Sequence, residues 1–469
     1  MRVVIVLDDA HPSPPHLSPR GEGRFEVQMP CRAFARGTIT IARALAVCVL
    51  TLAAATAPAA EEFTFDAAEF QKKPVEIGGY LELKHQQFRL NPDSAIYRVN
   101  FYQDPRARID QSTLTFKPSG VLRRGEASLR FRAHLDGDWE TRGFERSARF
   151  DEFYASYKPD PGFTLDAGKV SLKWGKGYAW NPVAFVERVK DPDDPELARE
   201  GFSMLTADWI RNFDGALRTV AFTPVVLPAS PDLNPDFGAG RHVNTAAKLY
   251  LLYHDTDIDF MFLGNGSRSR RYGADFSRNI TSNLEIHGEI ARITEAQRQV
   301  VSAAGQAMLV RGAATSWLLG VRYLTARDTT YILEYYRNGP GLSEDEMRTF
   351  SRFVDNAYAQ YLATGNGAPL ARAANLARGG YARPNAGRNY LYLRVSQKEP
   401  FDILYFTPAL TLVANADDRS TSVAPELLYT GFNNIELRLR AFFLGGGTDT
   451  EFGERRNSRR FELQGRIYF

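Results

Sequence analysis

Charged residues recur at every second position through much of the chain, and apolar residues fill the positions between them. Arg130 and Arg132, for example, alternate with Leu129 and Phe131. Alternate residues of a β-strand share one face, so such a stretch has one charged face and one apolar face. A charged face of mixed sign, set around a pore, can attract, orient and pass ions and polar solutes. The spacing favours this chemistry over catalysis.

Catalytic and cofactor motifs are missing from the sequence. It contains no Gly-x-Ser-x-Gly elbow, no His-Glu-x-x-His and no phosphate-binding loop. It also lacks Cys-x-x-Cys-His, and its two cysteines, Cys31 and Cys48, both precede residue 60. We therefore predict no enzyme, no cofactor and no metal site, with a lipase-like or protease-like barrel hydrolase as a less favoured alternative.

The composition excludes two further classes of protein. Among 469 residues, 24% are charged and 44% hydrophobic, and the formal net charge is only +3. A disordered chain would be less hydrophobic, and a polybasic nucleic-acid binder would carry far more positive charge. No nucleic-acid partner is expected.

The first sixty residues read as targeting sequence. Residues 1–28 are Pro-rich without apolar periodicity, and we predict that they are a non-native extension before a true start at Met29. Basic residues, an apolar run at 44–55 and an Ala-x-Ala site then predict a cleavable signal peptide over 29–60. The apolar run is too short to span a membrane. A short periplasmic segment, 61–74, is expected to follow.

The rest of the chain, residues 75–469, alternates in segments of about ten residues, of which we count about eighteen, with sixteen possible. No run approaches eighteen consecutive apolar residues, so transmembrane helices are not expected. Short turns alternate with longer connections, as in a closed antiparallel transmembrane β-barrel with short periplasmic turns and long extracellular loops. The strands are too long for the alternative of a soluble sandwich or propeller. The longer connections are predicted near 87–104, 137–148, 173–202, 225–243, 264–270, 295–313, 338–388 and 446–459, and one of the short turns at 397–400.

The last ten residues carry a second signal. A terminal aromatic, Phe469, follows apolar residues at alternate positions, namely Phe461, Leu463 and Ile467, with Gly465 as a mild departure. This segment resembles the C-terminal assembly signal of Gram-negative outer-membrane β-barrel proteins of porin-like type. The resemblance implies recognition by the barrel-assembly machinery, residence in the outer membrane, and contact with its lipid and lipopolysaccharide.

Charged side chains are costly on a lipid-facing surface, so the charged positions should face the interior of the barrel. We predict opposing basic and acidic walls that create a transverse field, or, as the favoured alternative, a ladder of cross-strand ion pairs such as Arg322 with Glu334. The residues predicted to line the pore are Lys84, Arg130, Arg132, Asp275, Glu285, Glu289, Arg322, Glu334, Arg394, Arg438, Arg440 and Arg466.

The connection near 173–202 is rich in glycine and aromatic residues and has an acidic second half. We predict that it folds inward and narrows the pore, although a solvated loop is the simpler alternative. Its candidate constriction residues are Trp174, Lys176, Tyr178, Trp180, Asp193 and Asp194.

Two other outer segments have recognisable patterns. Ser343 and Glu346 form a capping box ahead of a helix-permissive run at 344–363, which would make a lid or an exposed helix. A basic cluster at 455–460 could meet lipid phosphates, or simply be solvated.

Together these features predict a porin-like outer-membrane channel for passive diffusion of small polar solutes. A homo-oligomer is a possible assembly. A barrel that sheathes a partner such as an electron-transfer cytochrome is the alternative. A plugged transporter is not favoured, because about fifteen residues between leader and barrel leave no room for a plug domain.

Overall fold

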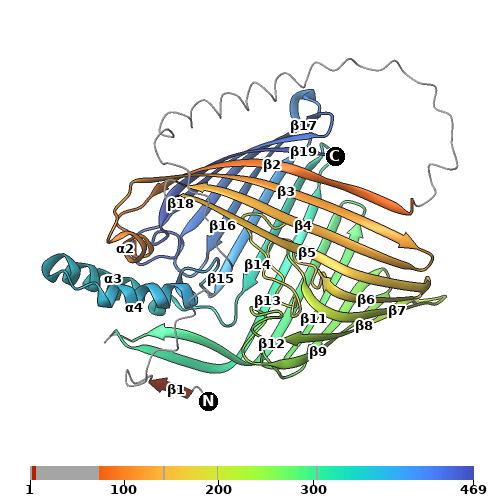
Figure 1. Cartoon of the computed structure of the whole chain (residues 1–469), viewed down its shortest axis with the longest axis horizontal. Coiled ribbons are helices and arrows are strands. Elements are labelled where there is room, and N and C mark those ends of the chain that lie inside the picture. The colour runs from red at the N-terminus through yellow and green to blue at the C-terminus, as the bar shows by residue number, and fades with distance from the viewer. Residues whose placement is uncertain (1–2, 7–72, 141–142, 198, 303–304) are drawn as a thin grey trace, which may run out of the picture. The chain divides into compact units, whose positions relative to one another are not determined.

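The computed structural model describes residues 3–6, 73–140, 143–197, 199–302 and 305–469. Eighteen strands, β2 to β19, pair antiparallel with their neighbours in chain order, and β19 pairs with β2 to close the ring (Figure 1). The predicted closed barrel of about eighteen strands is confirmed, and the alternative of sixteen strands is wrong. Closure gives every strand a neighbour on both sides, which is what a sheet needs in hydrocarbon.

The strands are long, and the first barrel strand begins at Val75 as predicted. The bounds are β2 Val75–Leu90, β3 Arg108–Arg124, β4 Ala127–Glu140, β5 Gly143–Asp160, β6 Phe163–Val170, β7 Phe202–Asn212, β8 Leu217–Ala229, β9 His242–Tyr253, β10 Thr256–Leu263, β11 Arg271–Thr281, β12 Leu284–Val301, β13 Ala307–Leu324, β14 Thr329–Arg337, β15 Asn389–Gln397, β16 Phe406–Asn415, β17 Thr421–Phe432, β18 Ile435–Gly445 and β19 Asn457–Tyr468. A further strand, β1 (Val3–Val6), pairs with β13 outside the ring.

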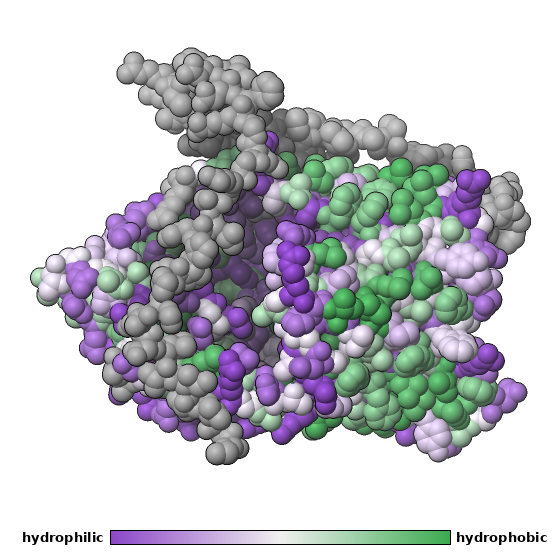
Figure 2. Space-filling model, turned by 60° about the horizontal axis from the view of Figure 1, so that its bottom comes forward, coloured by the Kyte–Doolittle hydropathy of each residue, from purple (hydrophilic) through white to green (hydrophobic). Residues whose placement is uncertain are grey.

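Hydrophobic side chains gather in a belt on the outward face of the barrel, bordered by hydrophilic residues (Figure 2). Ile290 and Leu319 are 52% and 55% exposed, whereas their chain neighbours Glu289 and Leu318 are buried. Large apolar side chains exposed in a continuous belt are stable only against lipid. The chain is therefore a transmembrane barrel. Among the described residues, no helix is long and apolar enough to cross a membrane.

The two ends of the barrel differ, and we call them the loop end and the turn end. At the turn end, connections such as 125–126 and 433–434 have two residues, whereas at the loop end 171–201 and 338–388 are the longest. An even number of strands leaves both Val75 and the end of β19 at the turn end.

Three predicted connections need correction, and a fourth connection was missed. β4 and β5 run through 137–148, and β12 and β13 run through most of 295–313, because a hairpin that projects beyond the lipid can be polar on both faces. The turn predicted at 397–400 extends over 398–405 and includes the short helix η4 (Pro400–Asp402). The loop-end connection at 416–420 was not anticipated.

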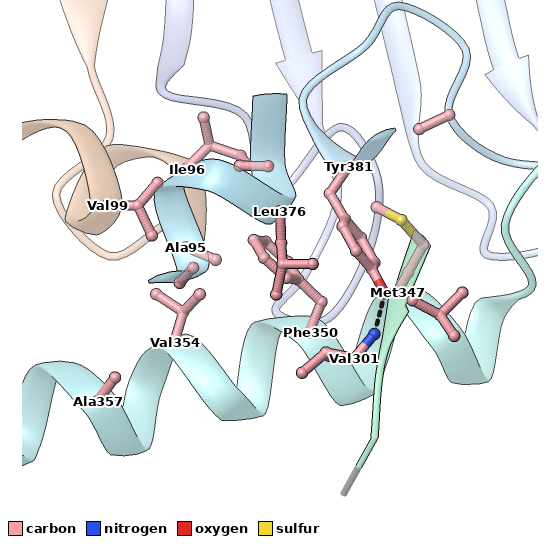
Figure 3. Packing of buried hydrophobic residues seen from close by; sticks show 14 of the residues in the cluster. Ala95, Ile96, Val99, Val301, Met347, Phe350, Val354, Ala357, Leu376 and Tyr381 are labelled. Carbon is pink, nitrogen blue, oxygen red and sulfur yellow. Dashed lines mark hydrogen bonds between the residues drawn. The ribbon is translucent and has the colours of Figure 1, made fainter. Parts of the chain in front are cut away.

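Helices cover part of the loop end. α2 (Ala95–Phe101), α3 (Glu344–Thr364), α4 (Ala368–Leu376) and the π-helical turn η3 (Ala377–Tyr381) pack around one apolar cluster with the outer part of β12 (Figure 3). Phe350 stacks on Tyr381 at 4.1 Å, and the Tyr381 hydroxyl accepts a hydrogen bond from the Val301 N–H at 3.0 Å. The predicted helix and its capping box of Ser343 and Glu346 are confirmed.

The C-terminal strand carries its apolar residues outward. Phe461, Leu463, Ile467 and Phe469 are all exposed on the belt, and Phe469 stacks on Phe116 at 5.8 Å. The predicted assembly role of these residues is not tested by this placement. The predicted signal peptide lies outside the described residues, as does almost all of the predicted segments 1–28 and 61–74.

Candidate functional site

Acidic side chains line up across neighbouring strands on the interior face of the barrel. The strand register places Asp259 of β10 opposite Asp275 of β11, and Asp275 opposite Glu289 of β12. All three are at most 4% exposed. Glu334 of β14 lies further round and is fully buried. We call these four residues the acidic wall.

A set of arginines lies on the interior face of β18 and β19 and is here named the basic wall. Its members are Arg438, Arg440, Arg460 and Arg466. Arg440 pairs with Glu462 on the next strand, Arg466 with Glu82 of β2 at 2.7 Å, and Arg438 with Glu436 at 3.2 Å. Three of the four guanidinium groups thus already have a carboxylate on β18, β19 or the adjacent β2.

The connection between β6 and β7, residues 171–201, contacts both walls, and we call it the inner loop. Glu289 accepts hydrogen bonds from the N–H groups of Lys176 at 2.7 Å, Gly177 at 2.6 Å and Val183 at 3.3 Å. A carboxylate on which several backbone N–H groups converge fixes the backbone around it. The acidic wall therefore organises the first half of the inner loop.

Glycines make this close approach possible. A Cβ on Gly177 would lie 2.1 Å from the Trp180 carbonyl oxygen, and one on Gly175 would lie 2.7 Å from a Glu289 carboxylate oxygen. Gly175 also has φ of 99°, which side chains rarely tolerate. The glycines around Trp174 and Lys176 are required because backbone, rather than side chain, meets the carboxylate.

Glu334 holds the next stretch of the inner loop in the same way. It accepts hydrogen bonds from the N–H groups of Tyr178 and Ala179, the second at 2.9 Å. His287 of β12 lies 2.9 Å from the same carboxylate. Because Glu334 is fully buried, these donors replace the water that its charge would otherwise need.

Aromatic packing fixes the middle of the inner loop against the wall. Trp180 stacks on Tyr336 with 5.1 Å between ring centroids and also contacts Tyr390 and Tyr392 at 5.9 Å. Trp174 is buried in a separate apolar cluster that includes Val183 and interior residues of β7 to β10. The inner loop thus packs against apolar clusters of the interior as well as against the acidic wall.

Electrostatic contacts also fix Lys176. Its ammonium group lies 2.9 Å from Asp259 of the acidic wall. Burial lowers the pKa of Lys176, but the hydrogen bond to Asp259 and its charge outweigh burial and raise that pKa above its ordinary value. Lys176 therefore stays charged and partly neutralises the acidic wall.

Inside the inner loop, Glu187 accepts a hydrogen bond from the Trp174 N–H and pairs with Arg199 at 2.7 Å. Burial raises the pKa of Glu187 to about 7 in spite of these partners. Lys190 donates to the carbonyls of Gly177 and Tyr178, and burial lowers its pKa. The inner loop is thus folded around its own charges as well as those of the wall.

The acidic second half of the inner loop meets the basic wall. Asp194 lies 3.3 Å from Arg440, and Asp193 lies 3.4 Å from Arg460. Arg440 also donates to the Asp193 carbonyl at 3.3 Å. Because the first half is held by β10, β12 and β14, the inner loop connects strands on two different sides of the ring.

Cavities remain beside the inner loop. One of about 510 Å³ is lined by Trp180, Glu187 and Arg188 of the inner loop and by Tyr336 of the wall. A second of about 220 Å³ is lined by Asp193, Arg460 and residues of the 338–388 connection. Both lie toward the loop end and have charged as well as aromatic surfaces.

The other residues predicted to line the pore lie on interior faces without a hydrogen bond or ion pair to the inner loop among the described residues. Arg132 pairs with Glu152 at 3.1 Å, and Arg394 with Glu426 at 2.8 Å. Glu285 accepts a hydrogen bond from Ser277 at 3.0 Å. The remaining members of this group are Lys84, Arg130 and Arg322.

The predicted pairing of Arg322 with Glu334 is wrong. The register of β13 and β14 places Gly320 opposite Glu334, and Ile332 opposite Arg322. Glu334 is therefore available to the inner loop and to His287. The sequence pattern did not predict either contact. Spacing along each strand was visible in the sequence, but the offset between strands was not.

Comparisons with known proteins add little beyond the fold. No family model matches the chain, and no curated protein matches it. Among solved structures, Pseudomonas aeruginosa OccK5 (OpdH) is similar over 84% of this chain and 98% of its own, with 12% identity and a TM-score of 0.48. P. aeruginosa OccD3 (OpdP) is similar over 84% of this chain and 91% of its own, with 10% identity and a TM-score of 0.46. A triple mutant of the Rhodopseudomonas blastica porin is similar over 84% of this chain and 100% of its own, with 11% identity and a TM-score of 0.38.

Proposed function

We propose that this transmembrane barrel is an outer-membrane channel through which small polar solutes diffuse passively, and that the inner loop is its constriction. The observation that carries the proposal is the attachment of the inner loop to both walls. Glu289 and Glu334 hold its first half, and Arg440 and Arg460 hold its second half. A segment fixed in this way narrows the passage and sets its polarity.

The chemistry of the interior supports this proposal. An eighteen-stranded barrel is too wide for side chains to fill, so its interior holds water. Charges of both signs face that water, and the outward belt is apolar. Small polar solutes are the class that such a surface admits, and the loop end would face the cell exterior.

The inner loop argues against the alternative of a sheath around a partner protein. A sheath needs an interior free for its partner, whereas the inner loop reaches from β10 to β19. A barrel hydrolase would need a nucleophile with its base. The sequence offers no such motif.

Conductance of the purified full chain in a planar bilayer tests the proposal. We expect steady single-channel conductance from the natural sequence. Replacing residues 176–196 by a short Gly–Ser linker should raise that conductance severalfold, because the narrowest part of the passage is removed.

A matched control replaces 401–404, an exposed part of the turn between β15 and β16, by the same linker. This change should leave conductance as it is, since these residues lie at the turn end, away from the inner loop. Absence of any conductance, or equal conductance with and without 176–196, would contradict the proposal.

A further inference from the structure

A cavity of about 480 Å³ at the loop end is lined by five arginines. They are Arg292 and Arg298 of β12, Arg311 of β13, Arg337 of β14 and Arg388 just before β15. None of the described residues that line this cavity is acidic. Five guanidinium groups around one space repel one another unless an anion lies among them.

Among the described residues, few acidic side chains neutralise these arginines. Glu346 of α3 pairs with Arg298 at 2.7 Å and lies 3.6 Å from Arg388. The other three arginines are exposed and make no ion pair with the described residues. Arg292 donates to the Thr315 hydroxyl at 2.7 Å, which fixes its side chain and leaves other N–H groups free.

The position of the cavity on the barrel indicates the source of the anion. Trp317 and Tyr335 stack at 5.2 Å on the outward face, and such aromatic pairs mark the edge of the lipid belt. The register places Trp317 opposite Arg337. Two residues further toward the turn end, Leu319 is exposed on the lipid-facing side.

Arg292 has the same placement on the neighbouring strand. It lies opposite Thr315, two residues beyond the exposed Ile290 of the belt. A step of two residues along a strand is about 7 Å. Arg292 and Arg337 therefore stand where the headgroups of the outer leaflet begin.

The cavity opens where two strands separate. β13 pairs with β14 only from Trp317 to Leu324, so the part of β13 toward the loop end has left its neighbour. Residues 310–315 line one side of the gap, and Arg337, Gly339 and Arg388 line the other. β1 pairs with Met308–Arg311 of β13, so the side of the gap that remains for a headgroup is the stretch of β13 from Gly312 to Thr315.

We propose that the five-arginine cavity binds the phosphate groups of a phosphorylated lipid of the outer leaflet. Guanidinium groups bind phosphate oxygens in a bidentate manner, which favours arginine over lysine at such a site. The lipid anchors the β12–β13 hairpin to the membrane surface. This inference rests on the loop end facing the cell exterior, as in the proposed function, and does not depend on solute passage.

Two arginines of the basic cluster at 455–460, Arg455 and Arg460, have partners within the protein. Arg455 donates to the carbonyls of Ala382 and Arg383 and pairs with Glu451 at 3.0 Å. Arg460 pairs with Asp193 of the inner loop. The residues of the five-arginine cavity are far apart in the sequence, and only the fold brings them together.

Native mass spectrometry of the purified full chain in detergent tests the proposal with diphosphoryl lipid A as the probe. We expect binding to the natural sequence and a loss of at least about tenfold in affinity in the triple variant R292Q/R311Q/R337Q, since each charged hydrogen bond contributes near or above a factor of ten. Equal affinity in the triple variant would overturn the proposal.

A matched control is R211Q/R278Q, which removes two exposed arginines at the turn end of β7 and β11. This variant should bind lipid A as the natural sequence does. Equal losses in both variants would show general charge attraction and overturn the site. Heat-modifiable migration in unheated gels verifies that each variant is folded.

Two further arms keep the result interpretable. The variant R292K/R311K/R337K retains charge and should keep part of the affinity. If the glutamine variant fails to fold, the lysine variant is compared with the natural sequence in its place. Sodium pyrophosphate is the second probe. If pyrophosphate competes fully at the concentration of lipid A, the cavity is a site for free phosphate, and the lipid assignment is wrong.

Discussion

The acidic wall and the basic wall use their charges in opposite ways. Carboxylates of the acidic wall accept backbone N–H groups of the inner loop, as Glu289 and Glu334 do. Arginines of the basic wall pair mainly with carboxylates of neighbouring strands, as Arg440 does with Glu462. The acidic wall binds the inner loop, whereas the arginines of the basic wall are largely neutralised by carboxylates of their own and neighbouring strands.

This difference bears on the hypothesis of a transverse field. Opposing walls of free charge would orient a solute, but the arginines of the basic wall are mostly paired. The cross-strand ladder therefore describes the basic wall well, although the particular pair of Arg322 and Glu334 does not form. The remaining asymmetry comes from the acidic wall and the loop that it anchors.

The largest expected effect follows from breaking the basic wall. Arg440→Ala removes the ion-pair partner of the buried Glu462, which keeps only its hydrogen bond from Gln86. The change should lower the free energy of unfolding by about 3–5 kcal/mol, as removal of one member of a buried pair does. Urea unfolding in lipid vesicles measures it. The double variant R440M/E462L should recover most of this loss, and a double variant as unstable as R440A would contradict self-neutralisation.

A smaller effect is expected from loosening the acidic wall. Glu334→Gln replaces a charged acceptor of the Tyr178 and Ala179 N–H groups and should cost about 2–3 kcal/mol. The inner loop should then fluctuate, which single-channel recordings detect as a noisier and higher conductance. Glu126→Gln, in the exposed two-residue turn between β3 and β4 and away from the inner loop, is the control and should record as the natural sequence does.

The aromatic contacts of the acidic side should contribute less again. Trp180→Phe keeps a ring but loses part of the contact with Tyr336, Tyr390 and Tyr392, at a cost of about 1–2 kcal/mol. Trp209→Phe is the matched control, because Trp209 is exposed on the outward face. Equal stability losses in the two variants would mean that Trp180 does not anchor the loop.

The smallest expected effect is a dependence of the inner loop on pH. Because burial raises the pKa of Glu187 to about 7 from an ordinary value of 4.5, the folded loop binds this proton more tightly than the unfolded chain does. Its stabilising contribution is complete below about pH 4.5 and is lost as the pH rises through 7. Proteolysis of the loop should therefore be faster at pH 8 than at pH 5, and Glu187→Gln should reduce that difference.

Much of the fold could be predicted because it depends on local pattern. Alternation with a period of two fixes which residues of a strand share a face, and this gave the strand number and the start of β2 at Val75. The capping box at Ser343 likewise depends on residues three apart. The ends of the β4–β5 and β12–β13 hairpins were missed, since beyond the lipid the apolar face disappears while the strands continue.

The site was only partly predictable for the same reason. Glycines and aromatics marked the inner loop as a segment that packs closely, and charge on alternate positions marked the wall residues. The carboxylate that meets each N–H depends on strand register, which placed Gly320 rather than Arg322 opposite Glu334. The five-arginine cavity draws on residues nearly one hundred positions apart, so no local pattern indicated it.

By itself, the sequence determined that apolar side chains at alternate positions form one continuous surface and that their polar neighbours form another, because the pleat of a strand allows nothing else. Only the tertiary structure decided the pairing of the charges. Closure of the ring brings β19 beside β2. The inner loop contacts both the acidic wall and the basic wall. Electrostatic partners depend on distances in space, which separation along the chain does not fix.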